Sequence, residues 1–137
     1  DRIANRALDR IVKFSKANVP FVPNTSIDFS TRFDDVVGVT IPDDDVQKET
    51  VVLKFEPDRF PYVVSKPIHH SQKVLSEEDC ILQIEVRPNK ELESVIFSYF
   101  PHVEVLAPAS LREEFKEKIA SNLKKYTSVQ NGRTDNI

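Results

Sequence analysis

The chain has 137 residues, of which 39% are hydrophobic and 30% charged, and its formal net charge is -3. This length suits one domain, or one domain plus pieces of a neighbour, and such a chain can bury a core without a disulfide or a metal. The slight acidity argues against binding DNA by bulk electrostatics, because phosphate binding needs a local excess of Lys and Arg. The one cysteine, Cys80, excludes an internal disulfide and favours a reducing, cytoplasmic location.

The sequence contains no membrane or phosphate-loop signal. No apolar run approaches the roughly 18 residues of a membrane span, and the N-terminus lacks a signal-peptide pattern, so we expect no membrane partner. The two glycines, Gly38 and Gly132, are too few for a glycine-rich phosphate loop. Methionine is absent even from position 1, so we expect a fragment or a trimmed product.

An alternating pattern within residues 1–17 predicts a strand over Arg6 to Phe14. On a strand, Arg6 and Arg10 share a face because they are four residues apart, and both could reach an anion such as a phosphate. An equally supported alternative is that Arg10 pairs with a carboxylate near Asp9. Arg6 and Arg10 are therefore the candidate residues for binding a ligand or a nucleic acid.

Residues 18–48 differ in composition from the segments on either side. Three prolines interrupt them, and several large apolar side chains argue against a free linker: Phe21, Ile27, Phe29 and Phe33. We predict a packed connector with one short helix at about 28–35. The acidic run 43–45 is interpreted as a solvated turn, since a calcium loop would need further oxygen ligands and a glycine.

The pattern from Glu49 onwards indicates a compact domain over 49–127. Alternation predicts strands at 51–55, 69–75, 80–87 and around 103–105. Helical periodicity predicts a short helix at 58–65, a second after an N-cap at Asn89, and a third after Ser110, which has capping-box spacing to Glu113. Residues 128–137 are predicted to be a flexible polar tail.

The resulting order is β-α-β-β-α-β followed by a C-terminal helix. This is the ferredoxin-like α+β arrangement, in which helices cover one face of a four-stranded antiparallel sheet. The other face would be open and polar. Because such a face commonly meets a second copy, we expect a homodimer. The residues predicted on the open face are Lys54, Glu56, Gln83, Glu85, Arg87, His102 and Glu104.

No pattern of residues indicates catalysis, a metal site or a cofactor. His69 and His70 are adjacent, so on a strand they would point to opposite faces and could not easily share a metal. Ser71 lacks an evident base and orienting acid. Cys80 is in register with apolar positions and is interpreted as a core residue. We therefore expect a protein that is not an enzyme.

Four runs of residues resemble parts of one family of proteins. ALDRI (Ala7–Ile11) resembles the end of a WYL domain, where a strand closes a small Sm-like β-barrel. Three further runs resemble the WCX domain, the C-terminal extension that follows WYL domains: VVLKFEPDRFPYV (51–63), HHSQKVL (69–75) and YFPHVEVLAPASLREEF (99–115). The resemblance covers nearly the whole chain up to Tyr126.

The resemblance implies a bacterial transcriptional regulator. Such regulators bind DNA through an N-terminal winged helix-turn-helix, sense a ligand or nucleic acid with the WYL barrel, and carry a ferredoxin-like WCX domain that supports dimerisation and ligand response. By position, Arg10 is the arginine of the LDRI motif, which implies a place on the sensing surface. This chain departs from the pattern: it has no tryptophan, has Arg6 where the family usually has an aromatic residue, and contains no helix-turn-helix.

The sequence therefore predicts the C-terminal regulatory, dimerisation and ligand-response module of a WYL-type regulator. The alternative is a free-standing ferredoxin-like domain that binds a small metabolite between its helices and its sheet.

Overall fold

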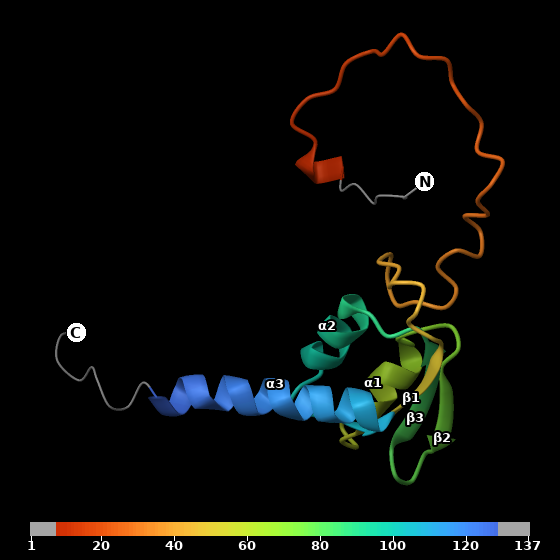
Figure 1. Cartoon of the computed structure of the whole chain (residues 1–137). Coiled ribbons are helices and arrows are strands. Elements are labelled where there is room, and N and C mark those ends of the chain that lie inside the picture. Colours follow the sequence, from red (N-terminus) through yellow and green to blue (C-terminus); the bar gives the residue numbers. More distant parts are fainter. Residues whose placement is uncertain (1–7, 129–137) are drawn as a thin grey trace.

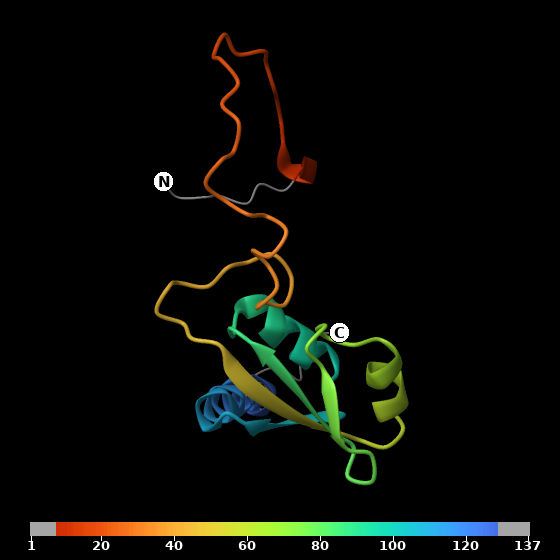
Figure 2. The same ribbon diagram turned by 90° about the vertical axis from the view of Figure 1, so that its right-hand side faces the viewer.

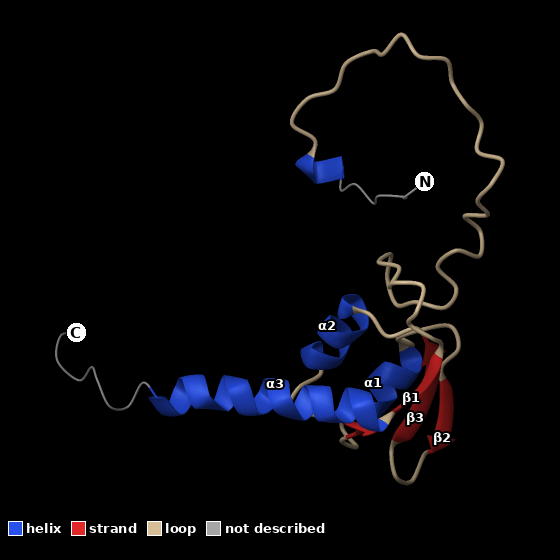
Figure 3. Ribbon diagram, viewed as in Figure 1, coloured by secondary structure: helices blue, strands red, loops and turns tan. Residues whose placement is uncertain are grey.

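The computed structural model describes residues 8–128 (Figure 1). A 3₁₀ turn, η1, comes first, and all the other elements follow residue 48 (Figure 3). The elements are η1 (Leu8–Arg10), β1 (Glu49–Phe55), α1 (Phe60–Ser65), β2 (Lys73–Ser76), β3 (Ile81–Val86), α2 (Lys90–Ser98), β4 (Val103–Ala107) and α3 (Ala109–Ser128).

The four strands form one antiparallel sheet in the order β2-β3-β1-β4. The central strand β1 sets the register on both sides: Leu53 lies opposite Leu82 of β3 and opposite Val105 of β4. All three helices lie on the same side of the sheet (Figures 1 and 2). The predicted ferredoxin-like α+β fold with an additional C-terminal helix is therefore confirmed.

Strict alternation along the strands places the core on the helix side of the sheet. The inward residues of β1, Val51, Leu53 and Phe55, are almost completely buried, as are Leu82 and Ile84 of β3. Each helix adds an apolar pair to the same cluster. The pairs are Phe60 and Val63 from α1, Leu92 and Ile96 from α2, and Leu111 and Phe115 from α3.

Asn89 joins helix α2 to the end of the connector. As predicted, it is the N-cap, and its Oδ1 accepts the backbone N–H of Leu92 at 2.8 Å. Its Nδ2 donates to the carbonyls of Val37 and Thr40 at 2.9 and 2.8 Å. Since Asn89 is buried, these partners replace the water that its amide loses on folding.

Gly38 allows the same stretch of connector to approach helix α2. The Glu91 carboxylate accepts the backbone N–H groups of Val39 and Thr40 at 3.0 and 2.6 Å. Gly38 has φ +75°, and a Cβ there would lie 2.6 Å from the Glu91 Cδ. The positive φ therefore favours glycine here, and a side chain would displace the Glu91 carboxylate from its two backbone partners.

The strand predicted over Arg6 to Phe14 is wrong for the residues that the structure describes. Leu8–Arg10 is a 3₁₀ turn, and residues 11–14 belong to no strand. Val12 and Phe14 are 99% and 91% exposed, and the described sheet includes no strand that pairs with this segment. Alternation identifies a segment that could pair, but only a partner makes it a strand.

The short helix predicted at 28–35 is also wrong, because the segment is a series of turns. Its backbone bonds join residues three apart, from Asp34 N–H to the Thr31 carbonyl and from Val36 N–H to the Phe33 carbonyl. At its start, the Asp28 carboxylate accepts both the N–H and the hydroxyl of Ser30. This local side-chain bonding competes with helix formation.

Three boundaries in the compact domain differ from the prediction. Strand β2 begins at Lys73, because His69 to Gln72 form a turn closed by the Gln72 N–H on the His69 carbonyl. Cys80, predicted in a strand, ends the preceding turn with φ 58°. Ser110 lies inside α3 and not at its N-cap, so no capping box forms, and Glu113 instead pairs with Lys116 at 2.9 Å.

Replacing Asn89 by Ala should lower the free energy of unfolding by about 2–3 kcal/mol, because a helix cap and two buried carbonyl partners are lost together. Asn89→Asp keeps the cap acceptor but removes both N–H donors, so it should also destabilise the domain. Urea unfolding of the three proteins measures the effect. An Asp variant as stable as the unmodified chain would show that the two connector bonds contribute nothing.

Candidate functional site

An apolar groove lies between helix α3 and the edge strand β4. Its cavity volume is about 400 Å³, and its wall is mainly hydrophobic. The lining residues are Phe100, Val103, Glu104, Val105, Arg112, Phe115, Lys116, Ile119, Ala120 and Leu123. Among the described strands, β4 pairs with β1 alone, so it forms one edge of the sheet, and Glu104, predicted on the open polar face, is one of the groove residues.

An aromatic cluster lies beside the groove, and two of its members, Phe100 and Phe115, line the groove. Phe115 of α3 stacks on Phe97 of α2 with ring centroids 4.6 Å apart, and Phe100 lies 5.2 Å from Phe97 and 6.2 Å from Phe115. Phe115 is 2% exposed, whereas Phe97 is 37% exposed. The cluster therefore extends from the core to the surface and contributes apolar wall to the groove.

Charged side chains lie along the rim of the groove. Arg112 pairs with Glu104 at 2.7 Å and donates through Nη1 to the carbonyl of Val105 at 2.5 Å. This contact gives one backbone carbonyl of β4 a hydrogen-bond partner.

On another side of α3, Lys118 pairs with Glu114 at 2.5 Å and also with Glu93 of α2. The hydrogen bond to Glu114, and then the one to Glu93, raise the pKa of Lys118.

The apolar stripe of α3 continues beyond the part that the sheet covers. Leu111 and Phe115 are buried as predicted, but Ile119 and Leu123 on the same face are 43% and 61% exposed. A helix of 20 residues is about 30 Å long, whereas a strand of 5 residues such as β4 spans about 17 Å. The second half of α3 therefore projects past the sheet (Figure 1).

Of the two arginines predicted to bind a ligand, Arg10 lies within the described residues and Arg6 does not. Arg10 is exposed and ends the 3₁₀ turn η1, and none of the carboxylates in residues 8–128 forms an ion pair with it. The alternative pairing with a carboxylate near Asp9 is therefore not formed within this range. Arg6 lies outside the described residues, so the shared face of Arg6 and Arg10 stays a prediction.

The two neighbouring histidines lie in the turn before β2, and their rings are close together. The ring centroids of His69 and His70 are 4.1 Å apart, which corrects the expectation of opposite faces. His69 is buried, its Nδ1 accepts the Ser71 N–H at 3.2 Å, and its Nε2 has no hydrogen-bond partner among the described residues. Burial, and then the neighbouring His70, lower the His69 pKa.

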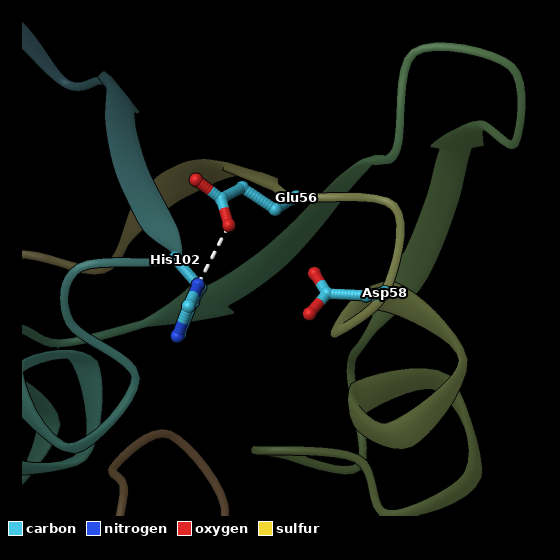
Figure 4. Close-up of side chains that lie close together, drawn as sticks. All are labelled: Glu56, Asp58 and His102. Atoms are coloured by element: carbon cyan, nitrogen blue, oxygen red, sulfur yellow. Dashed lines mark hydrogen bonds and ion pairs between the residues drawn. The ribbon is translucent and has the colours of Figure 1, made fainter.

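A third group of polar side chains was missed by the sequence reasoning. Glu56, Asp58 and His102 lie together where β1 ends and β4 begins (Figure 4). Their ligand atoms all lie within 4.8 Å of one another. The first two residues are two apart in sequence, but 46 positions separate Glu56 from His102, so no local spacing could have revealed the group.

Comparison with protein families identifies the domain that carries these features. Residues 47–121 match the WCX domain, a C-terminal domain of WYL-type regulators, so the chain belongs to the WCX family. The match begins two residues before β1 and ends within α3, and it includes most of the groove and all of the three-residue polar group. A comparison with curated proteins gives no match.

The family places the chain among the regulatory C-terminal modules of WYL-type regulators. Among residues 8–128, no helix is both long enough and apolar enough to cross a membrane.

The lowered His69 pKa predicts a loss of stability in mild acid. In the unfolded chain a histidine titrates near pH 6.5. Since the folded state binds this proton less readily, the free energy of unfolding should decrease as the pH falls from about 6.5 through the folded pKa. Urea unfolding at several pH values should show a smaller decrease for His69→Gln. An unchanged decrease in that variant would contradict the assignment to His69.

Proposed function

We propose that this chain is the regulatory, dimerisation and ligand-response module at the C-terminal end of a bacterial WYL-type transcriptional regulator. The observation that carries the proposal is the WCX match over residues 47–121, on a domain that exposes an apolar groove beside an uncovered helix. The complete regulator would be cytoplasmic and would bind DNA through an N-terminal helix-turn-helix. The module itself would have no enzymatic activity, and the regulatory role by itself would need no cofactor.

The projecting half of α3 supports the dimerisation part of this proposal. Ile119, Leu123 and Tyr126 share one face of the helix, and Tyr126 is 74% exposed. A second copy could place its own α3 along this stripe and cover the groove of the first. Burial of several large apolar side chains on each partner is the main source of stability at such an interface.

The N-terminal segment supports a connection to a sensing domain. Several large apolar side chains of residues 8–22 are strongly exposed, including Leu8, Phe14 and Phe21. A WYL barrel would cover them and would place Arg10 on its sensing surface. An effector with phosphate groups, whether a nucleic acid or a small molecule, would suit the exposed Arg10 guanidinium. Differential affinity of the effector for two states would then bias DNA binding.

Light scattering over a tenfold concentration range should show that the chain forms a dimer. The double variant Ile119→Glu/Leu123→Glu should be monomeric, because four carboxylates would then be buried across the interface without partners. The control is Ser121→Glu, which adds a charge on the opposite side of the same exposed turn and should leave the dimer intact. A chain that is monomeric throughout would contradict the dimerisation part of the proposal.

The groove also supports a second function, the binding of a small apolar metabolite without a sensing barrel. A volume of about 400 Å³ lies within the range of small-molecule sites. This function predicts that an apolar fluorescent probe binds the isolated chain with a blue-shifted emission. The groove-filling variant Ala120→Trp should weaken probe binding about tenfold or more, while Ser121→Trp should not. Equal effects of the two variants would exclude the groove as the probe site.

A further inference from the structure

The side chains of Glu56, Asp58 and His102 form a cluster with the composition of a metal site, which we call the carboxylate–histidine cluster. The Nδ1 of His102 lies 2.6 Å from Oε2 of Glu56, and the Asp58 carboxylate points towards this pair (Figure 4). One nitrogen and one oxygen from each carboxylate all lie within 4.8 Å of one another. These three atoms come from two strand ends and a turn.

The backbone fixes the positions from which these side chains extend. Phe55 of β1 lies opposite Val103 of β4, and the ladder continues one pair further, with the Glu56 N–H donating to the His102 carbonyl at 3.0 Å. The Glu56 carbonyl accepts the N–H groups of Arg59 and Phe60 at 3.0 and 3.1 Å. The turn that contains Asp58 is therefore tied to the same point.

Contacts with the hydrophobic core also hold the backbone of His102 in place. His102 donates its backbone N–H to the Tyr99 carbonyl at 2.8 Å, and the Tyr99 ring packs edge-on against Phe55 at 5.2 Å. Phe55 is buried. Because the backbones of Glu56 and His102 are both anchored, a bound ion would need only side-chain rotation to complete its coordination, and the ordering cost would be small.

The charges around the cluster favour a cation. The cluster holds two carboxylates and one imidazole, so its acidic groups outnumber its basic one. Within residues 8–128, the one basic side chain that forms an ion pair with the cluster is Arg59, whose Nε lies 4.0 Å from Asp58 Oδ2. Both partners of this pair are more than half exposed, so it neutralises Asp58 only weakly.

We propose that the carboxylate–histidine cluster binds a divalent transition-metal ion of the Zn²⁺ type. A mixed nitrogen and oxygen donor set suits Zn²⁺ and its neighbours, whereas Mg²⁺ and Ca²⁺ prefer oxygen ligands alone. Around Zn²⁺, ligands at about 2.1 Å in a tetrahedron lie ~3.4 Å apart, which the exposed carboxylates can reach by rotation from their present separations. The metal would replace the direct contact between His102 and Glu56.

Three protein ligands leave the fourth position of a tetrahedral site to water or to a group from a partner. The ion would also hold the turn 99–102, which presents Phe100 to the groove. The metal site therefore lies next to the proposed interaction surface, but its existence does not depend on the regulatory role.

Isothermal titration of the whole chain with ZnCl₂ in a chelator-free buffer at pH 7 tests the proposal. We expect one ion per chain and a rise in the unfolding temperature with Zn²⁺, because the ion binds the folded state alone. Asp58→Asn and His102→Ala should each raise the Kd for Zn²⁺ at least tenfold, since the first replaces a carboxylate by a neutral amide and the second removes the imidazole. MgCl₂ should give much weaker binding.

Matched controls distinguish the cluster from other acidic or histidine positions. Glu78→Gln replaces a carboxylate by an amide at an exposed position in the turn between β2 and β3. His70→Gln removes the exposed member of the neighbouring histidines His69 and His70. Both should bind Zn²⁺ like the unmodified chain. If His102→Ala unfolds, the exposed Asp58→Asn substitution decides the result. No binding, or binding that Asp58→Asn leaves unchanged or His70→Gln abolishes, would overturn the proposal.

Discussion

The burial of one face of the central strand β1 is the constraint on which the structure depends. Val51, Leu53 and Phe55 are all buried, and Leu53 lies between Leu82 of β3 and Val105 of β4, while Val51 lies opposite Ile84 of β3 and Phe55 opposite Val103 of β4. A shift of one residue would turn these three side chains towards solvent, so burial fixes the register on both sides. The helices then have one apolar surface available to them, and α1, α2 and α3 all pack on it.

The exposed groove follows from the different lengths of the elements on that surface. The sheet covers the first part of α3, where Leu111 and Phe115 lie, but β4 is too short to follow the helix further. The same register places the end of β1 against the start of β4, which brings Glu56 to His102. The apolar groove and the carboxylate–histidine cluster thus lie along the same edge strand, with Phe100 in the turn between them.

Much of the compact domain could be predicted because its signals are local. Alternation located β1, β3 and β4, and Asn89 identified the start of α2 through the side-chain preference of an N-cap. The predictions failed where a local pattern allowed two outcomes. Residues 8–14 alternate but have no partner strand, and Ser110 has capping-box spacing although the helix has already begun at Ala109.

The sequence by itself determined the class of fold, the inward face of each main strand and the resemblance to the WCX family, because periodicity and motif are properties of neighbouring residues. Only the tertiary structure decided which apolar residues of α3 stay exposed and which polar residues meet. Ile119 and Phe115 occupy equivalent positions in the helical pattern, yet only Phe115 lies over the sheet. Glu56 and His102 meet because antiparallel pairing of β1 and β4 joins distant segments, and no spacing along the chain encodes that pairing.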